Sequence, residues 1–469
     1  MQHALRRFVI CILAGVLAIP FAGAPGEAAA SDAPHVEGPI GNAGIWGHAL
    51  WDSWYDLADV GYTEDEYFVS GIARSAASPG QTAPFTTRII VARPEDPQRF
   101  NGTVLLDWVN VTAQFENAVD SVSSHEMLIR DGYAFVHASV QAAGICCTPL
   151  TPKVWDPLRY MTLSHPGDDY KFDIFSQIAL AVRSPGTDTM AGLDVDRLIA
   201  AGQSQSASGL YGYVTQAQAA ANVIDGFLIH GGGSKSYATP PTVPVLHLLS
   251  DSEASPSSPN TTTNYRLWEM GGASHSDFWI GYHQVFGQGP RALLHREQTP
   301  VAKDERLHVI AGNYGERLHP MQATCVLAGS MYPTRYVVNA AIHSLDRWIR
   351  TGEEPANSPR FEFDANSQLA RDEHGNTRGG LRLPVVDVPV ARYESTVCAL
   401  GGITVPFTNL QLHQLYPTHS DYYSKVVAAS QRSMSEGFLL PEDADDLQER
   451  ACSAKKRWRF DIAPAACSP

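Results

Sequence analysis

Apolar residues along this chain form short β-like runs that alternate with longer segments of helical spacing. In the N-terminal half the β-like runs are separated by turns rich in Pro, Gly and Asn. The pattern predicts strands at residues 67–72, 86–92, 103–110 and 134–141, and helices at 117–130 and 172–183.

The alternation becomes clearer in the second half of the chain. It predicts strands at 197–201, 226–230, 245–249 and 265–270, and helices at 206–218, 336–350 and around 441–455. Strands that alternate with helices indicate a mostly parallel sheet covered on both faces. Residues 360–395 are expected to be extended and rich in turns.

Two long irregular stretches, residues 144–168 and 281–335, interrupt this pattern. We expect them to form lid-like insertions over a substrate pocket. The predicted organisation is a signal peptide at 1–30, a catalytic α/β domain at 31–360 and an extension at 361–469 packed on the core.

Composition narrows the functional classes. The chain has 469 residues, of which 44% are apolar and 18% charged, so wholesale disorder, collagen and coiled coil are excluded. The formal net charge is −15. Nucleic acid is therefore not an expected partner, because an acidic protein repels the phosphate backbone.

The first thirty residues have the pattern of a secretory signal. Arg6 and Arg7 precede a short apolar stretch, and Ala28-Ala29-Ala30 offers a cleavage site before Ser31. We expect a secreted or periplasmic protein with no stable membrane insertion. Six cysteines remain after cleavage, and an oxidising compartment permits disulfide bonds among them. Two local pairs stand out, a vicinal one and one near the C-terminus: Cys146-Cys147, and Cys452 with Cys467.

The most informative stretch is an apolar strand that enters Gly202-Gln-Ser204-Gln-Ser206 and then a helix rich in small residues. It matches a nucleophile elbow with Ser206 in place of the second glycine. Small residues at these positions allow a strained serine backbone, which lifts Oγ of Ser204 above the sheet. The ordinary interpretation is a strand–turn–helix junction with Ser206 as the N-cap.

In this architecture the acid and then the base follow the nucleophile along the chain. The strand at 245–249 is followed by Asp251 and Glu253, and we favour Glu253 as the acid with Asp251 as the alternative. The next strand ends in Gly-Gly-Ala-Ser-His275, so His275 is the candidate general base.

Two loops are candidates for binding an oxyanion. The turn after the strand at 103–110 includes Asn110, whose backbone N–H we expect to act together with that of Gln205. An ordinary Asx turn at Asn110 is equally consistent with the sequence. The stretch His230-Gly-Gly-Gly233 looks like a lipase oxyanion loop, but it follows the nucleophile, and we interpret it as a flexible strand end.

The chain resembles a family of secreted bacterial α/β-hydrolase domain proteins to which esterase activity is ascribed. The matching stretches span most of residues 65–455 and begin at Asp107, Gly132, Gly202, Trp268, Trp348 and Arg378; the last reads Arg-Gly-Gly-Leu-Arg-Leu-Pro-Val-Val-Asp-Val-Pro. The resemblance implies an α/β-hydrolase fold with Ser204 as nucleophile and His275 as base. The family commonly has Asp where this chain has Glu253, so the choice of acid stays open.

Together these features predict a secreted serine hydrolase that cleaves carboxylic esters through an acyl-enzyme. The substrate is a small-molecule or polymeric ester, and no cofactor is expected, because no HExxH, P-loop or GxGxxG motif occurs. The alternatives are an acyltransferase with the same triad and a non-catalytic secreted binding protein on a hydrolase scaffold. The sequence gives no oligomeric state.

Overall fold

The computed structural model describes residues 33–53, 55–184, 186, 188–282, 329–398 and 400–454. The expected signal peptide lies outside these residues, as do Cys325, Cys467 and most of the insertion at 281–335. Within the part that the structure describes, no helix is both long and apolar enough to cross a membrane.

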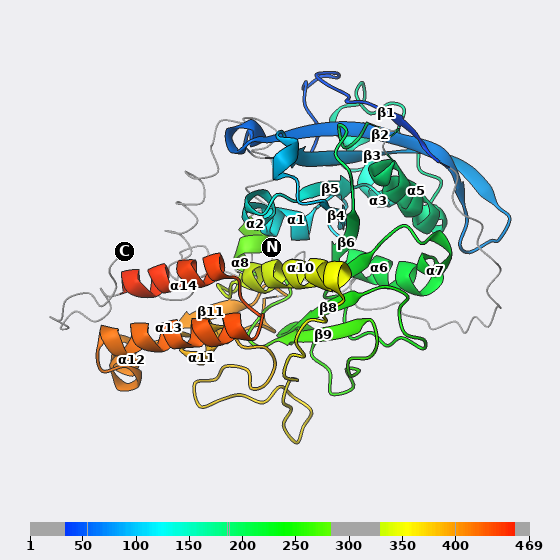
Figure 1. The fold of residues 1–469 in the computed structure, drawn as a ribbon. Helices are drawn as coiled ribbons and strands as arrows, with labels where there is room; N and C mark the ends of the chain where they lie inside the picture. Colours follow the sequence, from blue (N-terminus) through cyan, green and yellow to red (C-terminus); the bar gives the residue numbers. More distant parts are fainter. Residues whose placement is uncertain are drawn as a thin grey trace, which may run out of the picture.

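A nine-stranded sheet forms the centre of the protein, in the order β1-β2-β3-β5-β4-β6-β7-β8-β9 (Figure 1). The pairs β1–β2, β2–β3 and β3–β5 are antiparallel, and every later pair in this order, from β5–β4 to β8–β9, is parallel. This confirms the expected mostly parallel sheet. The strands are His35–Glu37 (β1), Tyr62–Arg74 (β2), Thr82–Pro94 (β3), Thr103–Trp108 (β4), Ala134–Ala138 (β5), Arg197–Gln203 (β6), Gly226–His230 (β7), Val245–Ser250 (β8) and Tyr265–Met270 (β9).

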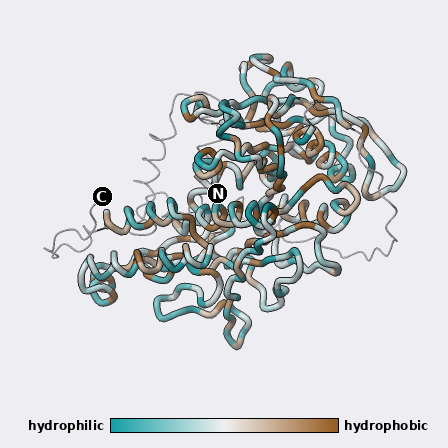
Figure 2. The backbone as a smooth tube through the Cα atoms, in the orientation of Figure 1, coloured by the Kyte–Doolittle hydropathy of each residue, from teal (hydrophilic) through white to brown (hydrophobic). Residues whose placement is uncertain are grey.

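Both faces of the parallel strands are buried, which explains their continuous apolar sequences. Neighbouring residues on a strand point to opposite faces, so Leu105 and Leu106 of β4 enter different clusters. Figure 2 shows apolar segments in the interior and polar ones over the peripheral loops.

The two faces are covered by different helices. One face packs against Val119–Ser123 (α1), His125–Arg130 (α2) and Thr334–Thr351 (α10). The other packs against Lys171–Arg183 (α5) and Gln205–Gln216 (α6). The helix predicted at 117–130 is thus two short helices that meet at Ser124.

Short elements connect these layers. The short α-helices are Ala142–Ile145 (α3), Pro152–Trp155 (α4), Gln218–Ala221 (α7) and Phe278–Tyr282 (α8). The 3-10 helices are Leu57–Val60 (η1), Pro97–Arg99 (η2), Asp168–Tyr170 (η3) and Asp251–Glu253 (η5).

The described residues after α10 add a hairpin and four helices beside the sheet (Figure 1). These are Pro384–Asp387 (α11), Ala391–Glu394 (β10), Ile403–Pro406 (β11), Asn409–Leu415 (α12), His419–Ser435 (α13) and Pro441–Ser453 (α14). Some of their apolar side chains form a small cluster of their own. Other apolar side chains of this segment, in these elements and in the loops between them, join the main cluster on the α10 face: Leu381, Leu383, Val386, Tyr393, Phe438 and Leu447.

Candidate active site

Ser204 occupies the tight junction between β6 and α6. Its backbone has φ 64° and ψ −112°, a conformation that costs a non-glycine residue about 1–3 kcal/mol. A Cβ on Gly202 would lie 3.1 Å from Oγ of Ser206, so the turn requires a small residue there. Ser206 lies inside α6 and donates its hydroxyl to the carbonyl of Gln203 at 2.8 Å. The interpretation of Ser206 as the N-cap is therefore wrong, because Ser204 holds that position.

His275 lies in the loop after β9 and contacts Ser204 directly. The distance from its Nε2 to Oγ of Ser204 is 2.7 Å. The loop approaches the C-terminal segment closely at Gly272, which has φ 96°. A Cβ there would lie 3.0 Å from Val386, and a side chain would strain this backbone conformation. The glycines before His275 thus allow the loop to pack tightly while it presents the imidazole.

Glu253, at the end of η5, completes a chain of three side chains. Its Oε1 lies 3.2 Å from Nδ1 of His275, and both side chains are about nine-tenths buried, with 10% and 11% exposed. Ser250 donates to the other carboxylate oxygen through its N–H at 3.2 Å and its hydroxyl at 3.0 Å. Burial raises the pKa of Glu253, but the contact with His275 and the hydrogen bonds from Ser250 outweigh it and lower this pKa to about 2.

Asp251, the alternative acid, is tied to other residues. Its carboxylate accepts from Gly272 N–H at 3.0 Å, from Ser395 Oγ at 2.7 Å and from Thr377 Oγ1. Arg371 lies 3.5 Å from the same group. Burial raises the pKa of Asp251, although these hydrogen bonds oppose the rise. The structure thus brings Glu253, and not Asp251, to His275.

Two of the three glycines at 231–233 contact the acid. The φ values of the three are 78°, 77° and 75°, a left-handed run that side chains rarely adopt. A Cβ on Gly231 would lie 2.7 Å from Oε1 of Glu253, and Gly233 N–H donates to that atom at 3.3 Å. The sequence signal for this role is the glycine run directly after a strand, for which the sequence predicts only a flexible strand end.

The two residues expected to bind an oxyanion are placed differently. Gln205 is the first residue of α6, directly after Ser204. Asn110 N–H, in contrast, donates to the carbonyl of Asn117 at 2.8 Å, so it is already paired. The next N–H, that of Val111, makes only a long contact of 3.4 Å with the side chain of Gln205.

Two amide side chains, which sequence reasoning did not connect, link the loops of the site. Asn110 Nδ2 donates to the carbonyl of Gln203 at 2.9 Å, and Gln203 Nε2 donates to the carbonyl of His275 at 3.0 Å. The loop after β4, the nucleophile turn and the histidine loop are therefore joined. No sequence motif marks these contacts, because they pair side chains with backbone atoms of distant segments.

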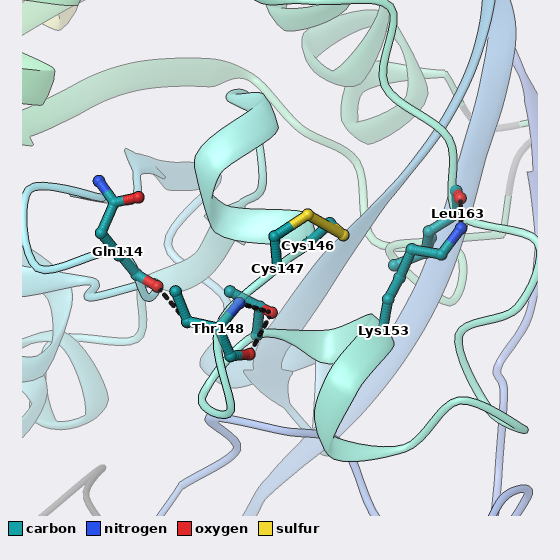
Figure 3. The surroundings of a disulfide bond; sticks show 7 residues. Gln114, Cys146, Cys147, Thr148, Lys153 and Leu163 are labelled. Carbon is teal, nitrogen blue, oxygen red and sulfur yellow. Dashed lines mark hydrogen bonds between the residues drawn. A yellow bond between two sulfur atoms is a disulfide. The ribbon is translucent and has the colours of Figure 1, made fainter.

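The expected insertion at 144–168 packs beside this loop cluster. A Cβ on Gly144 would lie 3.0 Å from the Val111 side chain, and Thr148 Oγ1 donates to the carbonyl of Gln114 at 2.7 Å. Figure 3 shows that Cys146 and Cys147, between these two contacts, are joined by a disulfide bond. Within the described part of the chain, no group of three or more His, Cys, Asp or Glu could hold a metal ion.

Comparison with known proteins agrees with this fold. Residues 34–449 match the family described as alpha/beta hydrolase domain. The chain belongs to this family. The fold is thus the α/β-hydrolase fold that the sequence predicted, and the family supports a hydrolase. No curated protein matches the chain.

Two of the solved structures that match this alpha/beta hydrolase are distant from it in sequence. XC6422 from Xanthomonas campestris, a serine hydrolase without a lid, is 17% identical, with 49% of this chain and 97% of that chain covered and a TM-score of 0.29. A glucuronoyl esterase from Teredinibacter turnerae is 11% identical, with 49% and 63% covered and a TM-score of 0.25. Similarity at this level adds nothing about the substrate.

Proposed function

We propose that this protein is a serine hydrolase that cleaves carboxylic esters through an acyl-enzyme. The observation that carries the proposal is the chain of contacts from Ser204 through His275 to Glu253. Such a relay holds the base in one tautomer and orientation, as nucleophilic catalysis by serine requires. A non-catalytic binding protein would have no need of it.

In the proposed reaction Ser204 Oγ attacks the ester carbonyl while Nε2 of His275 takes the hydroxyl proton. Nδ1–H of His275 donates a hydrogen bond to Glu253, whose negative charge stabilises the imidazolium. Collapse of the tetrahedral intermediate releases the alcohol, which receives the proton from Nε2. Water then repeats the sequence on the acyl-enzyme and releases the acid.

The developing oxyanion needs two backbone donors. We propose the N–H of Gln205 for one, because it follows the nucleophile at the start of α6. For the second we propose Val111 N–H rather than Asn110 N–H, since the latter is paired with Asn117. Asn110 then acts as a support of the nucleophile turn through Gln203.

Hydrolysis of 4-nitrophenyl acetate by the mature chain tests this function. Ser204→Ala and His275→Ala should each lower kcat by at least about 10⁴-fold. Thr215→Ala, an exposed change on the same helix, is the matched control and should keep the wild-type rate. A Ser204→Ala protein that is folded and retains a tenth of the rate would contradict the proposal.

We also propose that the chain is exported and cleaved before Ser31. The basic and then apolar N-terminal pattern supports this, and so do the bonded states of Cys146, Cys147, Cys398 and Cys452, because disulfide bonds persist in oxidising compartments. The intact mass of the protein recovered outside the cytoplasm should lack residues 1–30. A mass that includes them would contradict export with processing.

A further inference from the structure

Lys235, on the segment that follows the three glycines, contacts α6 one turn beyond the nucleophile. A Cβ on Gly232 would lie 3.1 Å both from the Ser204 carbonyl and from Oγ of Ser208, so this segment runs along the first turn of α6. The Nζ of Lys235 is 3.5 Å from Oγ of Ser208. Ser208 is four residues after Ser204, on the same face of the helix and one turn away.

The ammonium group has no carboxylate partner in the described part of the chain. It rests 5.3 Å from the ring centroid of Tyr211, whose hydroxyl donates to the carbonyl of Ser236 at 2.6 Å and holds the segment in place. Partial burial lowers the pKa of Lys235, and the negative charge of Glu253 opposes this. Glu253 is itself satisfied by His275, so it does not pair with the lysine.

A cation without a carboxylate partner, one helical turn from the nucleophile, matters because the protein as a whole is acidic, with a net charge of −15. Such a protein repels anions on average, and a local positive group is needed to draw a negatively charged substrate into the site. Tyr211 and Ser208 leave the donor protons of Nζ available to an incoming acceptor, since a ring face and a long hydroxyl contact do not saturate them.

We propose that Lys235 determines specificity by binding a carboxylate group carried by the ester substrate, about one helical turn from the reacting carbonyl. The inference rests on the proposed esterase function and names its substrate class: esters with an anionic group on the acyl or the alcohol part. Lys235 binds and orients this group and takes no part in proton transfer.

Matched ester pairs test this inference. The mono-4-nitrophenyl ester of adipic acid is compared with 4-nitrophenyl hexanoate, and 6-carboxy-2-naphthyl acetate with 2-naphthyl acetate. The readout is the ratio of kcat/KM between the charged and the neutral member. In at least one pair this ratio should fall about fivefold in Lys235→Met and further in Lys235→Glu, and Lys235→Arg should retain most of it.

Lys425 provides the matched control. Its Nζ also lies over a tyrosine ring, 5.2 Å from the centroid of Tyr416, but on α13 in the C-terminal segment. Lys425→Met should leave the ratio unchanged. The wild-type ratio should also fall when salt rises from about 0.01 M to about 1 M, because screening weakens the charge contact. The salt series uses wild-type protein alone, so its result does not depend on whether a variant folds.

The outcomes separate the two proposals. If the esters are hydrolysed but the wild type prefers neutral ones in both pairs, or Lys235→Met keeps the ratio, the role of Lys235 is refuted and the esterase function stands. If no ester is hydrolysed and a fluorophosphonate does not label Ser204, the esterase function fails and this inference fails with it.

Discussion

Two acidic residues that are two positions apart in the sequence have different surroundings. Glu253 contacts Nδ1 of His275, whereas Asp251 binds the C-terminal segment through Thr377 and Ser395. We therefore expect the loss of the Glu253 charge and the loss of the Asp251 charge to have different consequences.

Glu253→Gln should lower kcat by about 10³–10⁴-fold, because the imidazole loses its orienting acceptor. Asp251→Asn should lower Tm by several degrees while the folded enzyme keeps kcat within about tenfold, because it disrupts a buried structural network. Ester hydrolysis and thermal unfolding of both variants check this. The reverse pattern would assign the acid to Asp251.

The lowered pKa of Glu253 links this residue to acid stability. Its ordinary pKa of 4.5 falls to about 2 in the fold, so the ionised form stabilises the protein above pH 4.5, and this contribution is lost as the pH falls from 4.5 towards 2. The difference in unfolding free energy between wild type and Glu253→Gln should shrink by about 3 kcal/mol over that range. Urea unfolding at several pH values measures it, and a constant difference would contradict the lowered pKa.

At the residue scale, the sequence could place Ser204, Glu253 and His275 because each follows a strand in the order of the fold. It could not exclude Asn110 as an oxyanion donor. The contact that occupies the Asn110 N–H comes from Asn117, across a local bridge with no recognisable motif. The contact of Gln203 with His275 escaped prediction for the same reason.

At the element scale, the loop after β7 supports the site through backbone conformation. Gly231 and Gly233 have nearly the same left-handed φ, 78° and 75°, but only Gly231 leaves no room for a Cβ, since that atom would lie 2.7 Å from Glu253. At Gly233 nothing lies within 4 Å. Substitution of Gly231 should therefore cause both backbone strain and a clash with Glu253, whereas substitution of Gly233 should cause backbone strain alone.

Gly231→Ala should therefore lower kcat about tenfold or more, because Glu253 must move away from His275. Gly233→Ala carries the same backbone cost of about 1–2 kcal/mol and should lower stability without a comparable loss of kcat. Thermal unfolding and kcat of the two variants, measured together, check the prediction. Equal kcat values would show that the loop does not support the acid.

The regular elements of the sheet were predictable because buried parallel strands have continuous apolar sequences. The helices α12 and α13 were not predicted. In α13 buried positions such as Tyr422 and Val426 alternate with serines and charged residues, so its apolar face is narrow, and its capping box at Thr418 went unrecognised. The length of α13 and the residues that flank it do not by themselves distinguish this helix from a loop.

At the scale of the whole molecule, the C-terminal segment shares the main hydrophobic core. Leu381, Leu383, Tyr393, Phe438 and Leu447 are buried in the cluster that includes Leu105 and α10. The segment expected to pack on the core, residues 361–469, thus contributes side chains to it. The sequence could not show which side chains these are, because contacts across distant segments leave no local pattern.

A chain truncated after residue 360 should therefore not unfold cooperatively. Each large apolar side chain contributes about 1.5–3 kcal/mol when buried, so the loss of five exhausts the about 5–15 kcal/mol of an ordinary domain. Circular dichroism and thermal unfolding of residues 31–360 check this. A sharp transition near the wild-type Tm would show that the first part folds alone.

The central claim is that Ser204 is an activated nucleophile served by His275. The most direct test is to treat the folded mature protein with a fluorophosphonate and to map the adduct by mass spectrometry. The geometry predicts one adduct, on Ser204, that is lost in His275→Ala and kept in Thr215→Ala. An unlabelled Ser204 in the folded wild type, or labelling that does not depend on His275, would contradict the account.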